Sequence, residues 1–337
     1  MMQLAVIASG MVTPVGFTWA SSCAAMRAGI DGNAETRFMF DGQWLIGCAV
    51  PLAENYCGRE KLIQMALGSI RECLAAAGEI PSHAIPLLLC LSEPERPGRF
   101  IYDDENLIAE IQDRLGLRFH EDSQVFSLGR VGGVKALEGA DRLLAARHPL
   151  VILAGVDSFL NTATLTHYHS LDRLKTEENS DGFIPGEAGA AVLLGHSSGT
   201  GSPSLQCLGT GWGKEQAYLG SEEPLRADGM IQAVRQALKD SGCTYKDLDF
   251  RIADISGENY GFKEAGLSLL RTMRDLKCNF DLWHPAEYIG EAGAAIVPVI
   301  LSVALAACQK GYALGPGMLC HIGSDREERA ACILRHQ

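Results

Sequence analysis

Clusters of basic residues are missing from this sequence. The 337 residues include 29 Lys and Arg against 41 Asp and Glu, so the formal net charge is −12 at pH 7. Proteins that bind nucleic acid or anionic membranes need Lys and Arg gathered on one face. The charge balance therefore argues against both of these roles and is typical of a soluble protein with other partners.

Closely spaced cysteines are also missing. The eleven Cys are scattered, and no two of them form a Cys-x-x-Cys pair. An odd number of Cys, with no signal-peptide pattern ahead of the first strand-like run, predicts free thiols in a reducing cytoplasm. Zinc sites usually show Cys and His ligands at short, regular spacing. No such spacing occurs, so we expect neither a metal nor a cofactor.

A membrane-spanning segment is the third absence. The uncharged segment 292–309 is the main candidate, but it is rich in Ala and interrupted by Pro298. A spanning helix needs about 20 mostly apolar residues, and Ala contributes little to insertion. We therefore expect this segment to be a helix buried inside the protein, as part of a longer helix over 290–309.

Strand and helix patterns alternate through the chain. Short apolar runs predict buried strands, and apolar residues that recur every three or four positions predict amphipathic helices. This alternation favours an α/β domain in which helices cover a mixed sheet. The predicted strands are 4–8, 44–50, 87–91, 124–127, 150–154, 188–194, 205–208, 250–255, 318–321 and 331–335, and the predicted helices are 18–27, 60–77, 104–115, 132–147, 229–241, 263–276 and 290–309.

Five segments carry motifs in a fixed order. They are 6–16 with Thr13-Pro14-Val15-Gly16, 133–158 with a helix and an apolar strand, 180–191 with Asp181-Gly182-Phe183 and Gly186-Glu187-Ala188-Gly189-Ala190, 229–249, and 290–294 with Gly290-Glu291-Ala292-Gly293-Ala294. Each motif alone is weak evidence. Taken together, in order and spacing over nearly the whole chain, they make the sequence similar to the β-ketoacyl synthases of the thiolase-like superfamily.

The resemblance implies a thiolase-like fold with two similar α/β halves, which form five layers in the order α-β-α-β-α, and usually a homodimer. The halves would be 1–200 and 201–337, and the polar stretch 197–204 is the best seam between them. Cap insertions would fall at about 92–122 and 160–180. The chain is shorter than a typical ketosynthase, and we assign the losses to these caps, around 92–103 and 160–180.

The resemblance also indicates what a condensing enzyme of this kind needs. A thiolate at the start of a helix carries the acyl chain, and two histidines stabilise the charge left when the carboxylate departs. Matching Gly133 and the strand after it without gaps places Arg130 at the cysteine position. A one-residue gap places Gly129 there, and a larger slip places Ser127. No Cys occurs over 91–206, and an Arg side chain cannot be acylated.

The two histidine positions are expected at Ser256, after a predicted strand, and at Glu287, three residues before Gly290. All three catalytic residues are therefore expected to be absent. Ser127 could act as a substitute nucleophile, although the sequence shows no base for it. His284, three residues before Glu287, could reach the same pocket or be a packed loop histidine.

Other polar patterns have plainer interpretations. His167 and His169 have a spacing that suits a metal, but no third ligand is apparent. The charged run 326–329 occupies the tip of a predicted hairpin, where it is most simply a solvated turn.

Three hypotheses about function follow. The first is a catalytically degenerate ketosynthase-like protein that acts by binding, as an adaptor, chaperone or scaffold, for instance for a type VI secretion effector. The second is an acyltransferase or hydrolase that uses Ser127, Ser256, His284 or Glu287 in the inherited pocket. The third is a silent partner of an active ketosynthase, similar to a chain length factor. The corresponding partners are an effector, a carrier protein or an active ketosynthase.

Overall fold

Two sets of five strands, one from each half of the chain, build the core of the protein. The computed structural model describes residues 1–337 except 1, 3, 55, 101–103, 198–203 and 275–276. The first set comprises β1 (Leu4–Val12), β4 (Leu87–Leu91), β5 (Gln124–Ser127), β6 (Leu150–Ser158) and β7 (Glu187–His196). The second comprises β8 (Leu205–Lys214), β9 (Phe250–Ala253), β10 (Leu282–Trp283), β11 (Gly317–Gly323) and β12 (Glu328–His336).

The two sets have the same topology. The first runs in the order β5-β4-β6-β7-β1 and the second in the order β10-β9-β11-β12-β8. In both sets the first three strands are parallel and the last two are antiparallel to their neighbours. A short antiparallel pairing of Leu4–Val6 with residues 205–207 joins β1 to β8, so the sets form one continuous sheet. The expectation of two similar halves is confirmed, whereas the proposed boundary at 200/201 lies outside the described residues.

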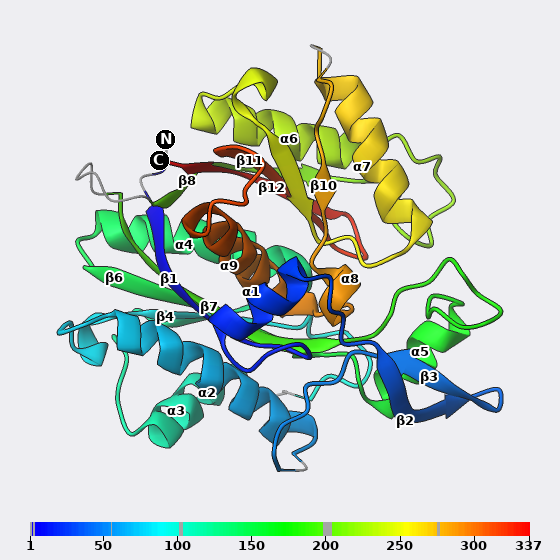
Figure 1. The fold of residues 1–337 in the computed structure, drawn as a ribbon, viewed down its shortest axis with the longest axis horizontal. Helices are drawn as coiled ribbons and strands as arrows, with labels where there is room; N and C mark the ends of the chain where they lie inside the picture. The colour runs from blue at the N-terminus through cyan, green and yellow to red at the C-terminus, as the bar shows by residue number, and fades with distance from the viewer. Residues whose placement is uncertain (1, 3, 55, 101–103, 198–203, 275–276) are drawn as a thin grey trace.

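The helices complete five layers (Figure 1). The outer layer of the N-terminal half contains α2 (Gly58–Ala76) and α3 (Asp104–Leu115), and that of the C-terminal half contains α6 (Asp228–Ser241) and α7 (Asn259–Thr272). Between the two sets of strands lie α4 (Gly132–Ala145) and α9 (Ile296–Gln309). The α-β-α-β-α arrangement is therefore confirmed. Helix α3 occupies 104–115 of the segment 92–122, where it packs against α2 in the outer layer.

The remaining elements lie outside this framework. They are α1 (Trp19–Arg27), the hairpin of β2 (Ala34–Phe40) and β3 (Gln43–Gly47), α5 (Thr162–Ser170) and α8 (Ala286–Ile289). The elements β2, β10, α5 and α8 were not predicted from the sequence, because short elements with little apolar periodicity carry a weak local signal. The helix predicted over 263–276 spans Asn259–Thr272, and positions 275–276 lie outside the described residues.

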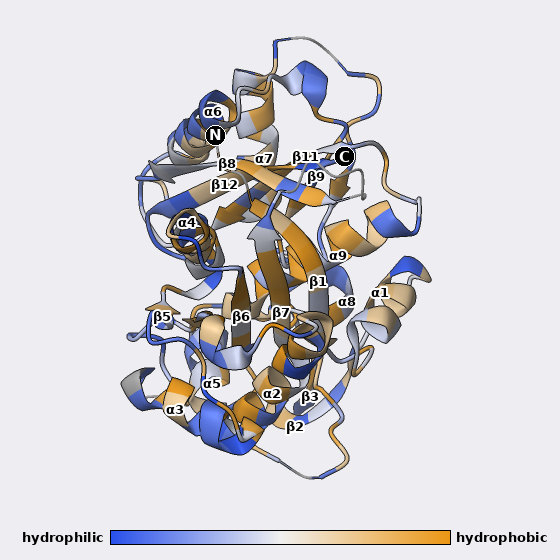
Figure 2. Ribbon diagram, turned by 90° about the vertical axis from the view of Figure 1, so that its left-hand side faces the viewer, coloured by the Kyte–Doolittle hydropathy of each residue, from blue (hydrophilic) through white to orange (hydrophobic). Residues whose placement is uncertain are grey.

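Apolar periodicity explains which faces are buried. In α2 the buried positions include Leu62, Ile63, Ala66, Leu67 and Ile70, the spacing that places side chains on one face of a helix. Strands β4 and β6 are buried along their whole length because helices cover both sides of the sheet. Figure 2 shows the apolar strands β6 and β7 at the centre of the molecule and hydrophilic residues on the outer helix α6.

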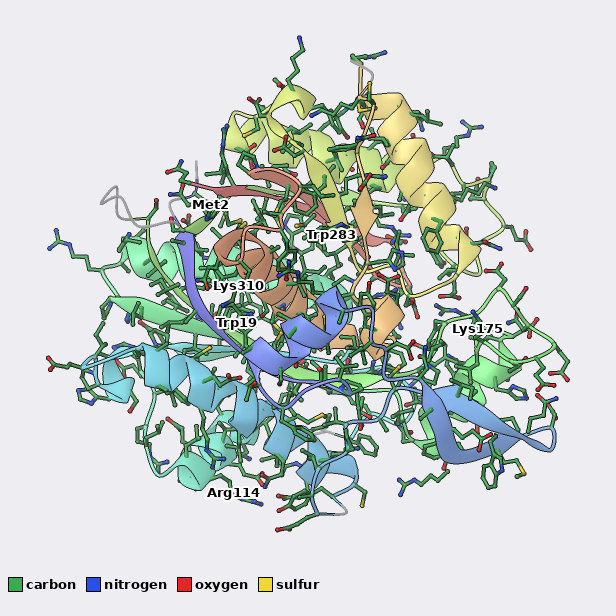
Figure 3. All side chains as sticks on the ribbon, in the orientation of Figure 1. Met2, Trp19, Arg114, Lys175, Trp283 and Lys310 are labelled. Carbon is green, nitrogen blue, oxygen red and sulfur yellow. The ribbon has the colours of Figure 1, made fainter. Side chains whose placement is uncertain are left out.

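Helix α9 is buried on all sides, as expected for the Ala-rich segment. Every residue from Ile296 to Cys308 is buried, and Pro298 lies in the first turn, where a missing N–H costs little. Trp19 and Trp283 pack against the cluster to which α9 contributes Val299 and Val303 (Figure 3). None of the helices in the described part of the chain is both long and apolar enough to cross a membrane.

The start of this helix differs from the prediction. The helix begins at Ile296 rather than at Gly290, and a 3₁₀ turn over Gly293–Ala295 precedes it. Gly293 has a φ of +49°, and a Cβ at this position would lie 2.0 Å from Oδ2 of Asp157. The chain therefore needs glycine here, and the irregular turn places the side chain of Glu291 beside the start of α4.

Candidate functional site

The candidate site lies where the starts of the two central helices meet. Strand β5 ends at Ser127, a 3₁₀ turn over Gly129–Val131 follows, and α4 begins at Gly132. Gly129 has a φ of +56°, and a Cβ there would overlap the Glu93 carboxylate at 1.8 Å. The turn therefore depends on glycine, and it directs the next side chain, Arg130, into the space between the halves.

Arg130 is held by three carboxylates. Its Nη1 lies 2.9 Å from Oε2 of Glu291, and its Nη2 lies 2.6 Å from Oδ1 of Asp325. Its Nε lies 3.5 Å from Oδ2 of Asp254. Burial alone would lower the pKa of Arg130, but the three carboxylates raise it well above its ordinary value. A cation near a helix N-terminus is unfavourable by itself, and these anions offset that effect.

Asp325 links Arg130 to a second guanidinium. Arg173 lies 2.8 Å from Oδ2 of Asp325, and the Tyr168 hydroxyl donates to the same oxygen. Arg173 also forms two hydrogen bonds of 2.8 Å with Glu258. Burial alone would raise the pKa of Asp325, but Arg130 and Arg173 hold it well below its ordinary value. Asp325 is therefore a permanent anion between two permanent cations.

Two other acids near Arg130 are disfavoured as anions. Burial raises the pKa of Asp254 to about 6, although Arg130 opposes the shift. Burial also raises the pKa of Glu93, against the effect of Arg96. Arg96 itself is buried and ion-paired with Asp157. The pocket is thus filled by a charged network in which the arginines fix some carboxylates as anions and leave others close to protonation.

The structure brings one of the two predicted histidine positions to Arg130. Ser256 follows β9 and lines a small cavity of about 50 Å³ together with Arg130 and His321. Burial lowers the pKa of His321 to about 3, so its imidazole is neutral, and its Nε2 has no hydrogen-bond partner among the described atoms. His321 is therefore a packed core residue near the site, not a base held by a partner.

The other predicted histidine position, Glu287, lies in a different cavity from Arg130. Glu287 is on α8 with a side chain that is 46% exposed, and its Oε2 is 4.0 Å from Nδ1 of His284. Both residues line a separate cavity of about 210 Å³ with Trp283 and Tyr288. From this segment of the chain, the carboxylate that contacts Arg130 is that of Glu291, four residues after Glu287. Among the described residues, neither Glu287 nor His284 lines the cavities of about 50 and 10 Å³ that Arg130 lines.

Ser127 lies at the end of β5 in a polar network of its own. Its Oγ donates to Oδ2 of Asp104 and accepts a hydrogen bond of 3.2 Å from Nη2 of Arg99. Asp104 is in turn paired with Arg99 at 2.7 and 2.8 Å. A carboxylate that is neutralised by a guanidinium is a poor general base. The pair therefore holds the hydroxyl in place rather than activating it.

No cysteine is among the described residues that line the cavities around Arg130 and Asp325. These cavities have volumes of about 50, 400 and 10 Å³. Cys90, on β4 beneath the start of α4, is fully buried, and burial raises its pKa far above the ordinary value. A buried thiol of this kind is neither accessible nor readily ionised.

The prediction of a solvated turn at 326–329 is wrong for Arg329. Its side chain is fully buried, its Nε bonds to both oxygens of Glu264, and its Nη2 donates to the Tyr260 hydroxyl. Arg326 at the same tip is 66% exposed, as expected. The strand β12 is buried continuously from Arg329 to Leu334, so the apolar run that follows Arg329, and not alternation, is the sequence signal that could have indicated its burial.

Comparisons with known proteins identify the class of fold. One similar chain comes from a structure of a type II polyketide synthase acyl carrier protein in complex with its ketosynthase. It aligns with this protein over 99% of both chains, with a TM-score of 0.80 and 14% identity. The ishigamide ketosynthase/chain length factor aligns over 99% of both chains with a TM-score of 0.79 and 16% identity. A β-ketoacyl synthase from Burkholderia phymatum aligns over 100% of both chains at 0.77 and 14%.

The protein therefore has the thiolase-like fold of the ketosynthases and chain length factors. Among curated proteins, the actinorhodin polyketide β-ketoacyl synthase 2 of Streptomyces coelicolor is 28% identical over 163 residues. The match covers 44% of this chain and 39% of that protein. No protein-family model matches the sequence. The expected resemblance is confirmed at the level of the fold, and the sequence has diverged far from these proteins.

Proposed function

We propose that the protein is a non-condensing subunit with a ketosynthase fold, of the chain-length-factor kind, which acts by binding an active ketosynthase. The observation that carries the proposal is the ion-paired Arg130 at the start of α4. An acyl chain must be transferred to a nucleophile at this point, and a guanidinium with three carboxylate neighbours is not one.

The surroundings of Arg130 support the same conclusion. Condensation also requires groups that stabilise the charge left by the departing carboxylate. Ser256, at the position predicted for one histidine, lines the small cavity, and Glu287, at the other predicted position, lines a separate cavity. Among the described residues, Nε2 of the neutral His321 has no hydrogen-bond partner that would orient the ring. We infer that the triad is absent and not relocated.

The structural relatives support a protein partner. Two of them are described as a ketosynthase with a chain length factor, one for ishigamide and one from Xenorhabdus doucetiae. The second aligns over 100% of this chain and 98% of that chain, with a TM-score of 0.72 and 12% identity. In this chain, β5 is an edge strand that pairs only with β4 among the described strands. Leu128, directly after it, is 44% exposed. We propose this edge as the partner surface, because an unpaired strand edge is a template for association.

We place this function in the cytoplasm, where the eleven free cysteines would stay reduced. The test is affinity purification of the tagged protein from its native cell, followed by mass spectrometry of retained proteins. Retention of a cysteine-bearing ketosynthase supports the proposal. Retention of a secretion effector alone would replace it with the adaptor hypothesis, and a homodimer with no other partner would also contradict it.

Two further measurements sharpen this test. Leu128→Asp should abolish retention of the ketosynthase, whereas Leu171→Asp, at an equally exposed leucine after α5, should not. Intact-mass analysis after incubation with acyl thioesters should show no adduct. A covalent adduct on Ser127 or Ser256 would instead establish the acyltransferase or hydrolase hypothesis.

A further inference from the structure

A second group of polar side chains lies at the far end of the N-terminal half. His120 and Asp122 are in the turn between α3 and β5, and His148 is in the connection between α4 and β6. Strand β5 and helix α4 both run between this end and the Arg130 site, so the two groups are at opposite ends of the same elements. In the described part of the chain, no other three His, Cys, Asp or Glu side chains converge in this way.

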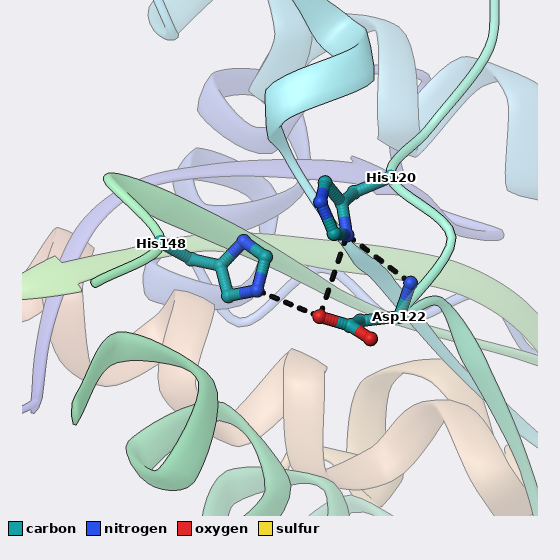
Figure 4. A group of neighbouring side chains, drawn as sticks. All are labelled: His120, Asp122 and His148. Atoms are coloured by element: carbon teal, nitrogen blue, oxygen red, sulfur yellow. Dashed lines mark hydrogen bonds and ion pairs between the residues drawn. The ribbon is translucent and has the colours of Figure 1, made fainter. Parts of the chain in front are cut away.

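The three side chains share one carboxylate oxygen. Oδ2 of Asp122 lies 2.9 Å from Nε2 of His148 and 3.4 Å from Nδ1 of His120 (Figure 4). The three ligand atoms all lie within 4.8 Å of one another. Two ligands bound at about 2.0–2.1 Å to a tetrahedral ion are about 3.4 Å apart. Side-chain rotations would bring all three atoms around one ion, and Nδ1 of His120 would exchange the hydrogen bond of 3.2 Å that it accepts from the N–H of Asp122 for the bond to the ion.

Both loops are held by their own hydrogen bonds. The His120 N–H donates to the carbonyl of Ile85 at 3.1 Å, and Ser123 Oγ donates to the carbonyl of His120 at 2.6 Å. The same Oγ accepts from the N–H of Leu87, at the start of β4. The His148 N–H donates to a carbonyl of α4, and its side chain is only 12% exposed. Ligands fixed in this way lose little freedom on binding an ion.

We propose that His120, Asp122 and His148 bind a divalent transition-metal ion, with Zn²⁺ as the best match. Two imidazole nitrogens and one carboxylate oxygen suit Zn²⁺ and its transition-metal neighbours, whereas Ca²⁺ and Mg²⁺ prefer oxygen ligands alone. The Asp122 side chain is 49% exposed, so water can take the fourth position. The bound ion connects the turn before the edge strand β5, which holds His120 and Asp122, to the connection before β6, which holds His148.

The test is titration of tag-free, EDTA-treated protein with Zn²⁺ in a calorimeter, with Co²⁺ absorption as a second readout of the ligand geometry. We expect one site, and a loss of affinity of at least about tenfold in both His148→Ala and Asp122→Asn. The matched control is His169→Ala. His169 forms a pair with Asp41 at 3.0 Å, but no third ligand among the described residues completes that pair, so its removal should leave the affinity unchanged.

Circular dichroism of the metal-free variants checks that they fold, and the partly exposed Asp122→Asn is the variant least expected to disturb the core. The proposal is overturned if the folded wild-type protein binds no Zn²⁺, if Asp122→Asn binds as tightly as wild type, or if His169→Ala weakens binding equally. None of these outcomes depends on the ketosynthase partner.

Discussion

Nη1 of Arg130 lies 2.9 Å from Oε2 of Glu291, which joins the start of α4 in one half of the molecule to the turn before α9 in the other. The other oxygen of Glu291 accepts the N–H of Gly293, so the acid also stabilises the turn that carries it. The ion pair of Arg130 and Glu291 therefore connects the two halves of the molecule where the two central helices begin.

Replacement of Arg130 should destabilise the fold strongly. Arg130→Ala leaves Glu291, Asp325 and Asp254 without their shared cation, and removal of one partner from a buried ion pair costs about 3–5 kcal/mol. The free energy of unfolding in urea measures this loss. Arg326→Ala is the control, because the Arg326 side chain is 66% exposed and its ion pair with Glu95 is long, at 4.0 Å. This substitution should change the free energy of unfolding by less than about 0.5 kcal/mol. Equal small changes in both variants would show that the network adds no stability.

The two central helices should not tolerate a larger residue where they meet. A Cβ at Gly133 of α4 would lie 2.3 Å from the Cβ of Val297 on α9. We expect Gly133→Ala to cost about 1–3 kcal/mol through overpacking, measured by thermal or urea unfolding. Gly139 lies in the same helix with its nearest atoms at 3.4 Å, so Gly139→Ala should be neutral or stabilising by up to about 1 kcal/mol. A neutral Gly133→Ala would mean that the helices are less closely packed than in this structure.

Stability should depend on pH through Asp254. Burial raises its pKa from 3.8 to about 6, so between these values the folded protein keeps a proton that the unfolded chain has released. The contribution of Asp254 to stability is therefore complete below about pH 4 and falls as the pH rises through about 6. Because Asn is uncharged at every pH, Asp254→Asn should gain about 2–3 kcal/mol relative to wild type between pH 4 and pH 7. Urea unfolding at pH 4.5, 5.5 and 7 measures this difference.

For Asp325→Asn, the change in folding stability with pH relative to wild type should have the opposite sign. Its pKa is lowered in the folded state by Arg130 and Arg173, which outweigh burial, so its stabilising contribution is present above its ordinary pKa and is lost on acidification. The wild type should therefore lose its advantage over Asp325→Asn below about pH 4. If both variants changed the pH dependence of stability in the same direction, the pKa values of Asp254 and Asp325 would not be shifted in opposite directions as described.

Thiol reactivity gives an independent check on the pocket. Cys57 and Cys278 are exposed, Cys243 is partly buried and the other eight cysteines are buried. Burial raises the pKa of Cys23 and Cys48 to about 12, which leaves little thiolate at pH 8. Iodoacetamide should therefore add two labels quickly and a third more slowly, as measured by intact mass. Rapid labelling of Cys90, beneath the start of α4, would contradict the structure and reopen the question of a pocket thiol.

Much of the fold could be predicted because its signals are local. Apolar runs and helical spacing placed the strands 87–91 and 124–127 and the helix 104–115 at the residues where the structure has them. Ordered motifs indicated the two halves. The elements that were missed, such as β10 with only Leu282–Trp283, are set by pairing with a neighbouring strand and leave little trace in their own sequence.

The sequence alone determined that no cysteine could stand at the start of α4, since none occurs over 91–206. The assignment of Arg130 to the cysteine position of the ketosynthases stays a prediction. Tertiary structure decided which side chains surround Arg130, that Glu287 points away from it, that Arg329 is buried and that His120 lies beside His148. Arg130 and Glu291 are 161 positions apart, and local patterns carry no information on such contacts. They arise only when α4 and α9 pack between the two sets of strands, because burial in that layer makes each charge depend on a partner from the other half.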